Sequence, residues 1–279
     1  MTRRCFFVPE MASDTKTFDL PPRLSRQLED VMRAKVGESI ELLDGWGSAW
    51  ECLIVGIRRG IVSVSLTGKL DRPVSESPLS VTLGIGIARS DTMDLVVRQA
   101  TEMGVLRLAV FRAARSQYGL SGKPAEKRKE RWSKIAMEAV CQCGRTRAPK
   151  IEIFGGLDRF LISLDGVSKA EAARRPGPAH GGIDRNDCSQ EGETEHILKI
   201  FALEDECGNA LRNLRSETGP DIRHVLALVG PEGGWDKSES SALIAAGFRP
   251  VSLGPRTLRL ETAAVALVCS LQVLWGDMS

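Results

Sequence analysis

Two short glycine-bearing segments near the C-terminal end carry residue types that could bind a ligand and do chemistry. The first reads Gly-Pro-Glu-Gly-Gly over residues 230–234, and the second reads Gly-Pro-Arg-Thr-Leu-Arg over residues 254–259, with Glu261 close behind. Glycine lets a backbone turn sharply and lets a ligand approach its peptide groups. Preorganised arginines can stabilise negative charge that develops in a reaction, and a carboxylate can move a proton. The two segments together therefore predict a ligand site.

Each glycine-bearing segment follows a predicted strand and leads into a predicted helix. Residues 225–229 are a continuous apolar run, which is typical of a strand buried on both faces of a parallel sheet. Residues 236–246 open with a capping-box pattern and predict a helix. Residues 250–253 predict the second strand, and residues 262–275 are apolar almost all round, which predicts a buried helix. Ligands of open α/β sheets bind where such loops converge at the carboxyl ends of strands.

The common nucleotide-binding motifs do not occur in this sequence, which has no G-x-x-x-x-G-K-[ST] and no G-x-G-x-x-G in either segment. The motifs V-G-P-E-G-G and L-G-P-R-T-L-R-L-E-T-A instead resemble the paired C-terminal motifs of the SPOUT methyltransferases, and more narrowly those of the RsmE family. Two further segments agree with that family, A-T-E-M-G-V at residues 100–105 and E-A-V-C-Q-C-G-R-T-R-A-P at residues 138–149. The resemblance is weakest in the first 70 residues.

The resemblance implies a methyltransferase that uses S-adenosylmethionine and acts on N3 of a specific uridine in 16S ribosomal RNA of the small ribosomal subunit. It implies an α/β fold with a SPOUT-type parallel sheet, a C-terminal trefoil knot, a small N-terminal PUA-like β-barrel domain and an obligate homodimer. Ordinary chain topology would have favoured an unknotted doubly wound sheet. The residues expected to bind the cofactor are Leu203, Leu228, Val229, Gly230, Pro231, Glu232, Gly233, Gly234, Leu253, Gly254, Arg256, Leu258, Arg259, Thr262 and Ala263.

The candidate catalytic residues are Arg256, Arg259 and Glu261. Methyl transfer from a sulfonium needs no metal, so the protein must align donor and acceptor and manage one proton. As the proton leaves uracil N3, negative charge spreads onto O2 and O4, and we interpret Arg256 or Arg259 as the cation that stabilises it. Glu261 is the candidate general base. The alternative, which we favour for these two residues, is that Glu261 pairs with Arg259 and braces the loop.

The composition is that of an ordinary soluble globular protein with one large or two modest domains. Of 279 residues, 42% are hydrophobic and 27% are charged, and the net charge of +2 identifies no partner. Residues 112–150 hold 11 basic and 3 acidic side chains, which predicts a phosphate-facing surface or, equally, a solvated helix face. Seven scattered cysteines favour a reducing compartment, and no spacing completes a metal site. We expect a cytoplasmic protein because no signal peptide is visible.

Residues 1–72 are expected to form the N-terminal β-barrel domain, with strands at 5–8, 39–43, 49–57 and 61–66. Small β-barrels often bind nucleic acid, and the resemblance implies that this one helps to hold ribosomal RNA. Many family members carry a histidine where this chain has Gln27, so any RNA contact of that histidine is lost. The residues expected to contact RNA across the whole chain are Arg3, Arg4, Arg33, Arg89, Arg115, Gln142, Arg145 and Arg147. Alternatively, Arg145 neutralises a helix C-terminus.

Residues 73–279 are expected to form the methyltransferase domain, after a linker at residues 67–78. Strands predicted at residues 79–88, 106–111 and 197–203 alternate with helices, which indicates a parallel α/β sheet. Residues 166–195 are rich in Gly, Pro, Ser and charged residues, so we expect a mobile insertion there.

Two other classes of function stay open from the sequence. One is a SPOUT methyltransferase acting on another ribosomal RNA position or on transfer RNA. The other is a non-catalytic RNA-binding factor of ribosome assembly that keeps the fold. Cofactor binding would separate an enzyme from a binding protein, and mapping of the methylated nucleotide would separate the enzymes.

Overall fold

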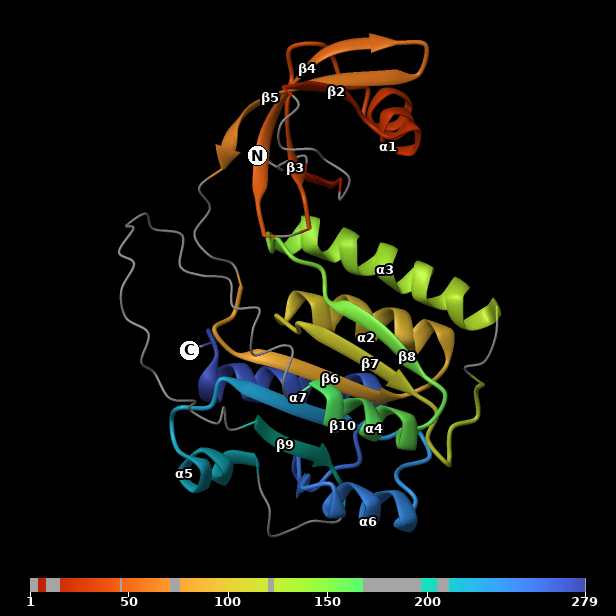
Figure 1. The fold of residues 1–279 in the computed structure, drawn as a ribbon, viewed down its shortest axis with the longest axis vertical. Coiled ribbons are helices and arrows are strands. Elements are labelled where there is room, and N and C mark those ends of the chain that lie inside the picture. The colour runs from red at the N-terminus through yellow and green to blue at the C-terminus, as the bar shows by residue number, and fades with distance from the viewer. Residues whose placement is uncertain are drawn as a thin grey trace.

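The computed structural model describes residues 5–8, 16–45, 47–70, 76–119, 123–167, 197–204 and 211–278. These residues form two sheets, with the smaller N-terminal sheet above the larger, helix-covered one in Figure 1. Arg3, Arg4 and the part of the predicted insertion that follows Val167 lie outside the described residues.

Five strands form the N-terminal sheet in the order β1-β3-β4-β5-β2. They are β1 (Cys5–Phe7), β2 (Thr17–Asp19), β3 (Ser39–Leu43), β4 (Ala49–Arg58) and β5 (Ile61–Leu70). β1 pairs parallel with β3, and the other neighbouring strands are antiparallel. Among the described residues, β1 and β2 each pair on one side only, so this sheet is open. β2 was missed by the sequence prediction, and β5 continues through Leu70 into the segment predicted as a linker.

A short helical segment covers one face of the N-terminal sheet. α1 (Pro22–Arg26) starts with proline, whose fixed φ suits the first turn of a helix, and passes directly into the π-helical turn η1 (Gln27–Val31). Leu28 of η1 is fully buried in the core of the sheet. The buried Ser25 hydroxyl accepts the backbone N–H of Val62 at 3.1 Å, which fixes α1 to β5.

Six parallel strands form the larger sheet in the order β11-β9-β10-β6-β7-β8. They are β6 (Ser80–Gly86), β7 (Arg107–Phe111), β8 (Lys150–Phe154), β9 (Ile197–Ala202), β10 (His224–Val229) and β11 (Arg249–Val251). The helices are α2 (Ser90–Glu102), α3 (Lys123–Cys143), α4 (Leu157–Val167), α5 (Leu214–Thr218) after a 3-10 turn η2 (Leu211–Asn213), α6 (Lys237–Ala245) and α7 (Leu260–Trp275). The parallel α/β sheet predicted from the sequence is confirmed, although β8 and α4 were not predicted.

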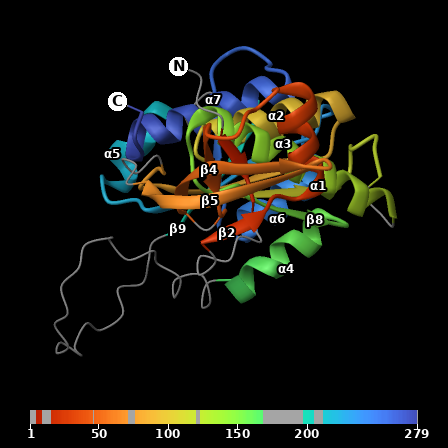
Figure 2. The ribbon, with the colours of Figure 1, turned by 90° about the horizontal axis from the view of Figure 1, so that it is seen from above.

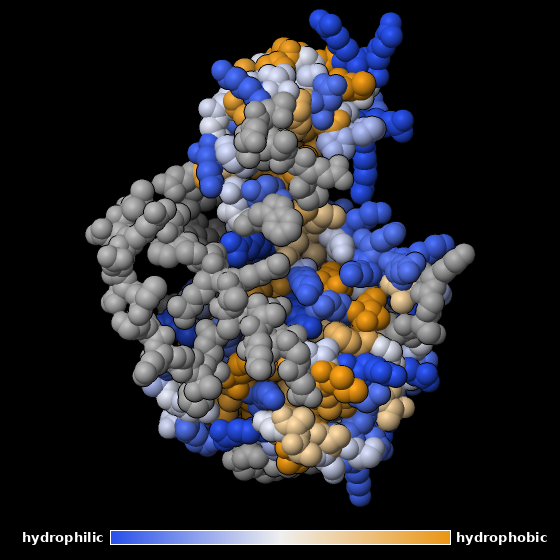
Figure 3. Space-filling view, in the orientation of Figure 1, coloured by the Kyte–Doolittle hydropathy of each residue, from blue (hydrophilic) through white to orange (hydrophobic). Residues whose placement is uncertain are grey.

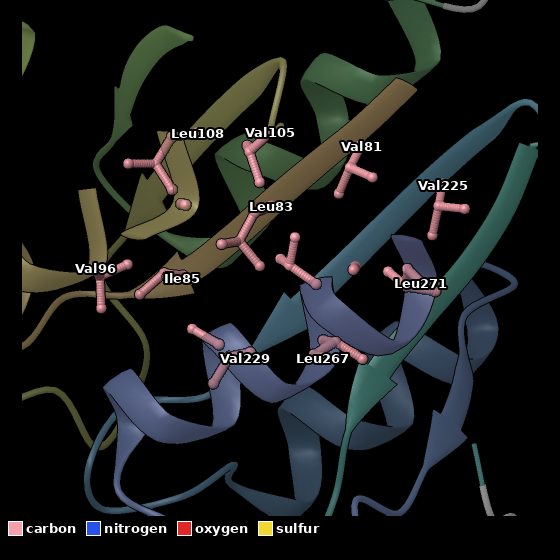
Figure 4. Packing of buried hydrophobic residues seen from close by; sticks show 14 of the residues in the cluster. Val81, Leu83, Ile85, Val96, Val105, Leu108, Val225, Val229, Leu267 and Leu271 are labelled. Atoms are coloured by element: carbon pink, nitrogen blue, oxygen red, sulfur yellow. The ribbon is translucent and has the colours of Figure 1, made fainter. Parts of the chain in front are cut away.

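Alternating side chains of the strands fill two separate cores, one on each face of the larger sheet. Val225 and Val229 of β10 pack toward α7, whereas Leu226 and Leu228 pack on the opposite face. Figure 4 shows Leu267 of α7 beside Val229. Viewed from above, α2, α3 and α7 lie on one side of this sheet, and α4 and α6 lie on the other (Figure 2). Burial on both faces explains why residues 225–229 read as a continuous apolar run.

The two sheets are connected by contacts to α3. Leu43 and Ala49 of the N-terminal sheet form a small buried cluster with Val140 of α3. Just beyond the residues that link the two sheets, the carboxylate of Glu76 binds the guanidinium of Arg145. The apolar cluster therefore holds the N-terminal sheet against the C-terminal part of α3, and the ion pair fixes Glu76 to the residues that follow this helix.

Candidate functional site

The two predicted loops lie at the carboxyl edge of the larger sheet. β10 ends in the loop of residues 230–236, and β11 ends in the loop of residues 252–259. Both strands are parallel neighbours of β9, which lies between them, so both loops leave the sheet at the same edge. The backbone N–H of Leu203 donates to Val251 O at 3.0 Å, which joins the end of β9 to the end of β11.

Trp235 connects the first loop to the end of β9. Its indole Nε1–H donates to Ala202 O at 2.9 Å, and a Cβ added at Gly230 would lie 3.1 Å from its ring. From the other side, a Cβ added at Gly86 of β6 would lie 2.6 Å from the backbone nitrogen of Pro231. The turn at residues 230–231 is therefore held between β6 and Trp235. The sequence reasoning missed Trp235 and Gly86, although Gly84-Ile85-Gly86 at the end of a predicted strand was an available signal.

Arg115, from the loop after β7, braces the other half of the first loop. Its Nη1 donates to Gly233 O at 3.3 Å, and its Nη2 lies 3.6 Å from a carboxylate oxygen of Asp236. The neighbouring backbone N–H of Ala114 donates to Glu239 at 2.8 Å. The side chain of Arg115 remains 52% exposed. Sequence analysis assigned Arg115 to RNA, whereas the structure places its guanidinium on the predicted cofactor loop.

The start of α6 is fixed by the predicted capping box. The side chain of Asp236 accepts the backbone N–H of Ser238 at 3.0 Å, and Glu239 accepts the backbone N–H of Asp236 at 3.1 Å. Hydrogen bonds from the Ser238 side chain and backbone, followed by the charge of Arg115, hold the pKa of Asp236 below its usual value. The first loop therefore enters α6 in a defined conformation.

Open space lies beside both loops, at Gly234 and Gly254. Both have positive φ, +71° and +118°, and a Cβ added at either would meet no atom within 4 Å. The aliphatic side chains of Leu253, Leu258 and Ala263 are only half-buried near the second loop. Peptide groups next to open space, with apolar side chains around them, fit a flat ring and a polar chain such as S-adenosylmethionine carries.

The structure limits what two of the predicted cofactor residues can contribute. The side chain of Leu228 is completely buried in the core on the α4 and α6 face, so it does not line an open site. Gly233 faces Arg115, because an added Cβ would lie 3.1 Å from the Cβ of Arg115 rather than in open space. A larger residue at position 233 would thus displace Arg115 instead of filling the site.

The three candidate catalytic residues lie on the second loop and on the first turn of α7. Arg256 and Arg259 are exposed, and Glu261 is half-buried. None of the three side chains forms a hydrogen bond or ion pair with another described residue. The predicted pairing of Arg259 with Glu261 is therefore wrong, because α7 begins directly after Arg259 and the two side chains do not meet. Both cations remain available to a ligand.

The predicted RNA contacts have different surroundings. Arg33 is exposed, and its backbone φ of +50° lies in the left-handed region. Gln142 is exposed on α3. Arg89 is exposed beside Asp91, at 3.2 Å. Arg147 is half-buried, and its guanidinium lies against Gly47 of the N-terminal sheet.

Arg145 has a structural role in this fold. Only 3% of its side chain is exposed, and its Nη2 lies 2.7 Å from Glu76 Oε2. Its Nη1 donates to Thr101 O at 2.6 Å and to Val105 O at 3.1 Å. These partners satisfy the guanidinium inside the protein, so the interpretation of Arg145 as a phosphate contact is corrected. The sequence shows an arginine near a helix end but not the distant Glu76 that binds it.

Within the described ranges, no group of three or more His, Cys, Asp or Glu side chains is arranged to hold a metal ion. The same residues include no helix that is long and apolar enough to cross a membrane.

The profile of the RNA methyltransferase domain family matches residues 75–177 and 185–272. The chain belongs to this family. The match begins one residue before Glu76, includes the larger sheet and both glycine loops, and ends within α7.

Relatives named ribosomal RNA small subunit methyltransferase E are similar to this chain over most of its length. The protein of Synechocystis sp. is 27% identical over 98% of this chain and 78% of its own length, and that of Bacillus subtilis is 25% identical over 96% of both. The crystal structure of such an enzyme from Neisseria gonorrhoeae, bound to S-adenosylmethionine, is 28% identical. It superposes with a TM-score of 0.77 over 99% of this chain and 100% of that one.

Proposed function

We propose that this chain methylates small-subunit ribosomal RNA in the cytoplasm with S-adenosylmethionine, and that the acceptor is N3 of a specific uridine in 16S rRNA. The observation that carries the proposal is the pair of glycine loops at one sheet edge, with open space at Gly234 and Gly254. Family membership and the similarity to the Neisseria enzyme support the same activity. The choice of uridine N3 rests on the resemblance of the C-terminal motifs to those of the RsmE family.

The cofactor is expected to lie across the two loops. When bound, it supplies a methyl group activated on a sulfonium. Peptide groups of residues 229–234 and 252–254 are expected to bind its polar parts, because the glycines of both loops allow a ligand to approach the backbone and residues 232–234 and 252–254 are exposed or half-buried. Leu253, Leu258 and Ala263 are half-buried and are expected to line its adenine ring.

The side chains of Arg256, Arg259 and Glu261 are proposed to act on the uracil. N3 must lose its proton when it takes the methyl group, for which the sulfonium would give up its carbon–sulfur bond and leave as a neutral thioether, and Glu261 is the proposed proton acceptor. Negative charge then spreads onto O2 and O4 of the ring. Arg256 or Arg259, exposed and without a carboxylate partner in the described part of the chain, stabilises that charge.

Arg259→Ala should lower kcat more than it weakens cofactor binding, because the charge that it stabilises exists only in the transition state. Arg249→Ala is the matched control, since Arg249 is also an exposed arginine near β11 but pairs with Glu217. Equal losses of kcat in the two variants would contradict this role for Arg259.

We further propose that the protein is a homodimer whose interface includes the outer face of α7. Ala266 and Cys269 are half-buried, Val273 is 55% exposed, and the three residues share one helical face. A second copy can cover this apolar stripe by two-fold symmetry. Sedimentation should give a species of about twice the chain mass of 30.4 kDa. Val273→Glu should shift it toward the monomer.

The trefoil knot and the domain division also remain proposals. α7 follows β11 at one edge of the sheet, yet it packs back on β10 and β6, so the chain must cross over β9 after the β11 loop. A knotted path requires a crossing of this kind. Residues 1–72 are proposed as a PUA-like domain that helps to hold RNA, and residues 73–279 as the methyltransferase domain. A fragment of residues 73–279 that binds S-adenosylmethionine would support this division.

The activity is tested with purified protein, labelled S-adenosylmethionine and small ribosomal subunits from a strain that lacks the gene. Label on N3 of one 16S uridine is the expected result. Label on transfer RNA, or on another base, would overturn the substrate assignment. The same transfer assay separates an enzyme from a non-catalytic assembly factor, which would transfer no methyl group even if calorimetry showed that it bound the cofactor.

A further inference from the structure

A hollow between the N-terminal helix and the larger domain is lined by side chains from both. Arg23 of α1 lies on one side, and residues of α2 and α3 lie on the other. In Figure 1, α1 projects above α3, and the hydrophilic side chains of this region are blue in Figure 3. The hollow, here called the interdomain groove, is lined by Arg23, Asp94, Arg98, Lys127, Glu130, Arg131, Lys134, Ile135 and Glu138.

The cations of the interdomain groove are mostly unpaired. Arg131 binds Asp94, with Nε 3.1 Å from the carboxylate. The side chains of the other four cations, Arg23, Arg98, Lys127 and Lys134, form no hydrogen bond or ion pair with a described residue. Because five basic and three acidic residues line the groove, its net charge is positive. Unpaired cations on one concave surface attract anions from solution.

The cations are spaced along an extended line. Lys127 and Lys134 are separated by seven residues of α3, roughly 10 Å along its axis, with Arg131 between them. One phosphate group is too small to reach both lysines, whereas successive phosphates of one nucleic-acid strand can each contact a different cation. Glu138, four residues after Lys134 on the same face of α3, ends this line of cations with a negative charge, and Glu130 lies beside it. An extended polyanion therefore fits better than a single small anion.

We propose that the interdomain groove binds the sugar–phosphate backbone of the ribosomal RNA that flanks the target nucleotide. The proposal rests on the proposed function, because it takes RNA as the substrate. Arginine and lysine are the side chains that bind phosphate. Among the described residues that line the groove there is no aromatic or amide side chain and Ile135 is the one apolar side chain, so we assign the groove to phosphates rather than to base recognition. The groove supplies affinity and orientation, whereas the base is selected elsewhere.

The position of the groove suits this role. α2 begins at Ser90, close after β6, and β6 is the neighbour of β10, which carries the first glycine loop. The groove lies between α1 and α2, the helix that leaves the sheet at the edge that holds the candidate site. RNA bound there touches both parts of the chain, so its orientation relative to the loops is fixed by the contact between the two sheets.

Neutral variants of the groove test this proposal. The double variant Arg98→Gln/Lys134→Gln is expected to raise the KM for small ribosomal subunits roughly tenfold or more, at unchanged kcat. The slope of log affinity against log salt should fall by about 1.5, since two phosphate contacts are removed. Affinity for S-adenosylmethionine should not change. Lys129→Gln is the matched control, because Lys129 is exposed on α3 but does not line the groove.

Three results would overturn the proposal. A fall in kcat at unchanged KM would assign these residues to the chemistry. An equal effect of Lys129→Gln would show that net charge, and not the groove, sets affinity. Loss of affinity for assembled subunits but not for protein-free 16S rRNA would identify a ribosomal protein as the partner. If the wild-type protein methylates no small-subunit RNA, the proposed function fails, and salt-dependent binding of 16S rRNA by the wild type and the double variant still tests the groove.

Discussion

Removal of the Glu76 carboxylate tests whether Arg145 is held inside the protein for structural reasons. Glu76 Oε2 accepts from Nε and Nη2 of Arg145, at 3.0 and 2.7 Å. Glu76 Oε1 accepts the backbone N–H groups of Thr146 and Arg147, both at 3.0 Å. The variant Glu76→Ala therefore leaves a buried guanidinium without its counter-charge and two backbone donors without their acceptor.

The expected cost of Glu76→Ala is about 3–5 kcal/mol in the free energy of unfolding, the range for breaking a buried ion pair by removing one partner. For a chain of this size, that corresponds to a fall in Tm of roughly 6–20 °C. Arg145→Met should also destabilise the fold. The double variant should lose less than the two single variants together, by about 2 kcal/mol, because it leaves neither charge unpaired.

Urea denaturation of the four proteins measures this cycle, with Glu126→Ala as the control because Glu126 is an exposed carboxylate on α3. Two results would refute the reasoning. One is a cost below about 1 kcal/mol for Glu76→Ala, and the other is additivity of the two single variants within about 0.5 kcal/mol. At a temperature where all variants stay folded, the KM for small ribosomal subunits should be unchanged. A raised KM in Arg145→Met alone would indicate that Arg145 contacts RNA.

Asp236→Ala should lower the Tm by removing the N-cap acceptor of α6, and Asp236→Asn should lower it much less; thermal unfolding measures both. Gly254→Ala should weaken S-adenosylmethionine binding in calorimetry, because φ of +118° strains any side chain there by about 1–3 kcal/mol. Burial alone would raise the pKa of Glu152, but hydrogen bonds and charge from Lys150 and Arg107 hold it below the usual 4.5. Because the folded pKa is the lower one, Glu152 stabilises the fold above about pH 4.5, and this stability is lost as the pH falls through the folded pKa. Urea denaturation at pH 7 and pH 3 should therefore show a larger acid loss for the wild type than for Glu152→Gln, and equal losses would contradict the ion pair.

The elements around the candidate site could be predicted because their signals are local. The apolar run of residues 225–229 predicted β10 to within one residue, and the Asp236–Glu239 spacing predicted the capping box. β8 was missed because Glu152 interrupts its short apolar pattern; the partner that makes this charge acceptable, Arg107, lies on β7. β2 was missed because only three residues pair with β5.

Contacts that depend on the fold could not be predicted from spacing. Trp235 follows the first glycine loop in the sequence, but its hydrogen bond to Ala202 requires that β9 lie between β10 and β11. Gly233 was predicted as a cofactor contact from the loop alone, and only the approach of the loop after β7 places Arg115 against it. In both cases the sequence identified the loop, and the tertiary fold determined what each side chain touches.

The basic segment of residues 112–150 contains more positive charge in its sequence than it leaves unpaired in the folded protein. Four of its cations, Arg115, Arg131, Arg145 and Lys150, form ion pairs with carboxylates outside the segment. Those pairs offset half of its excess positive charge, so a count over the sequence overstates the surface offered to phosphate. The cations left unpaired are the better candidates for RNA contact. Lys127 and Lys134 are among them, and the fold places both in one groove with Arg23 and Arg98, which are distant in sequence.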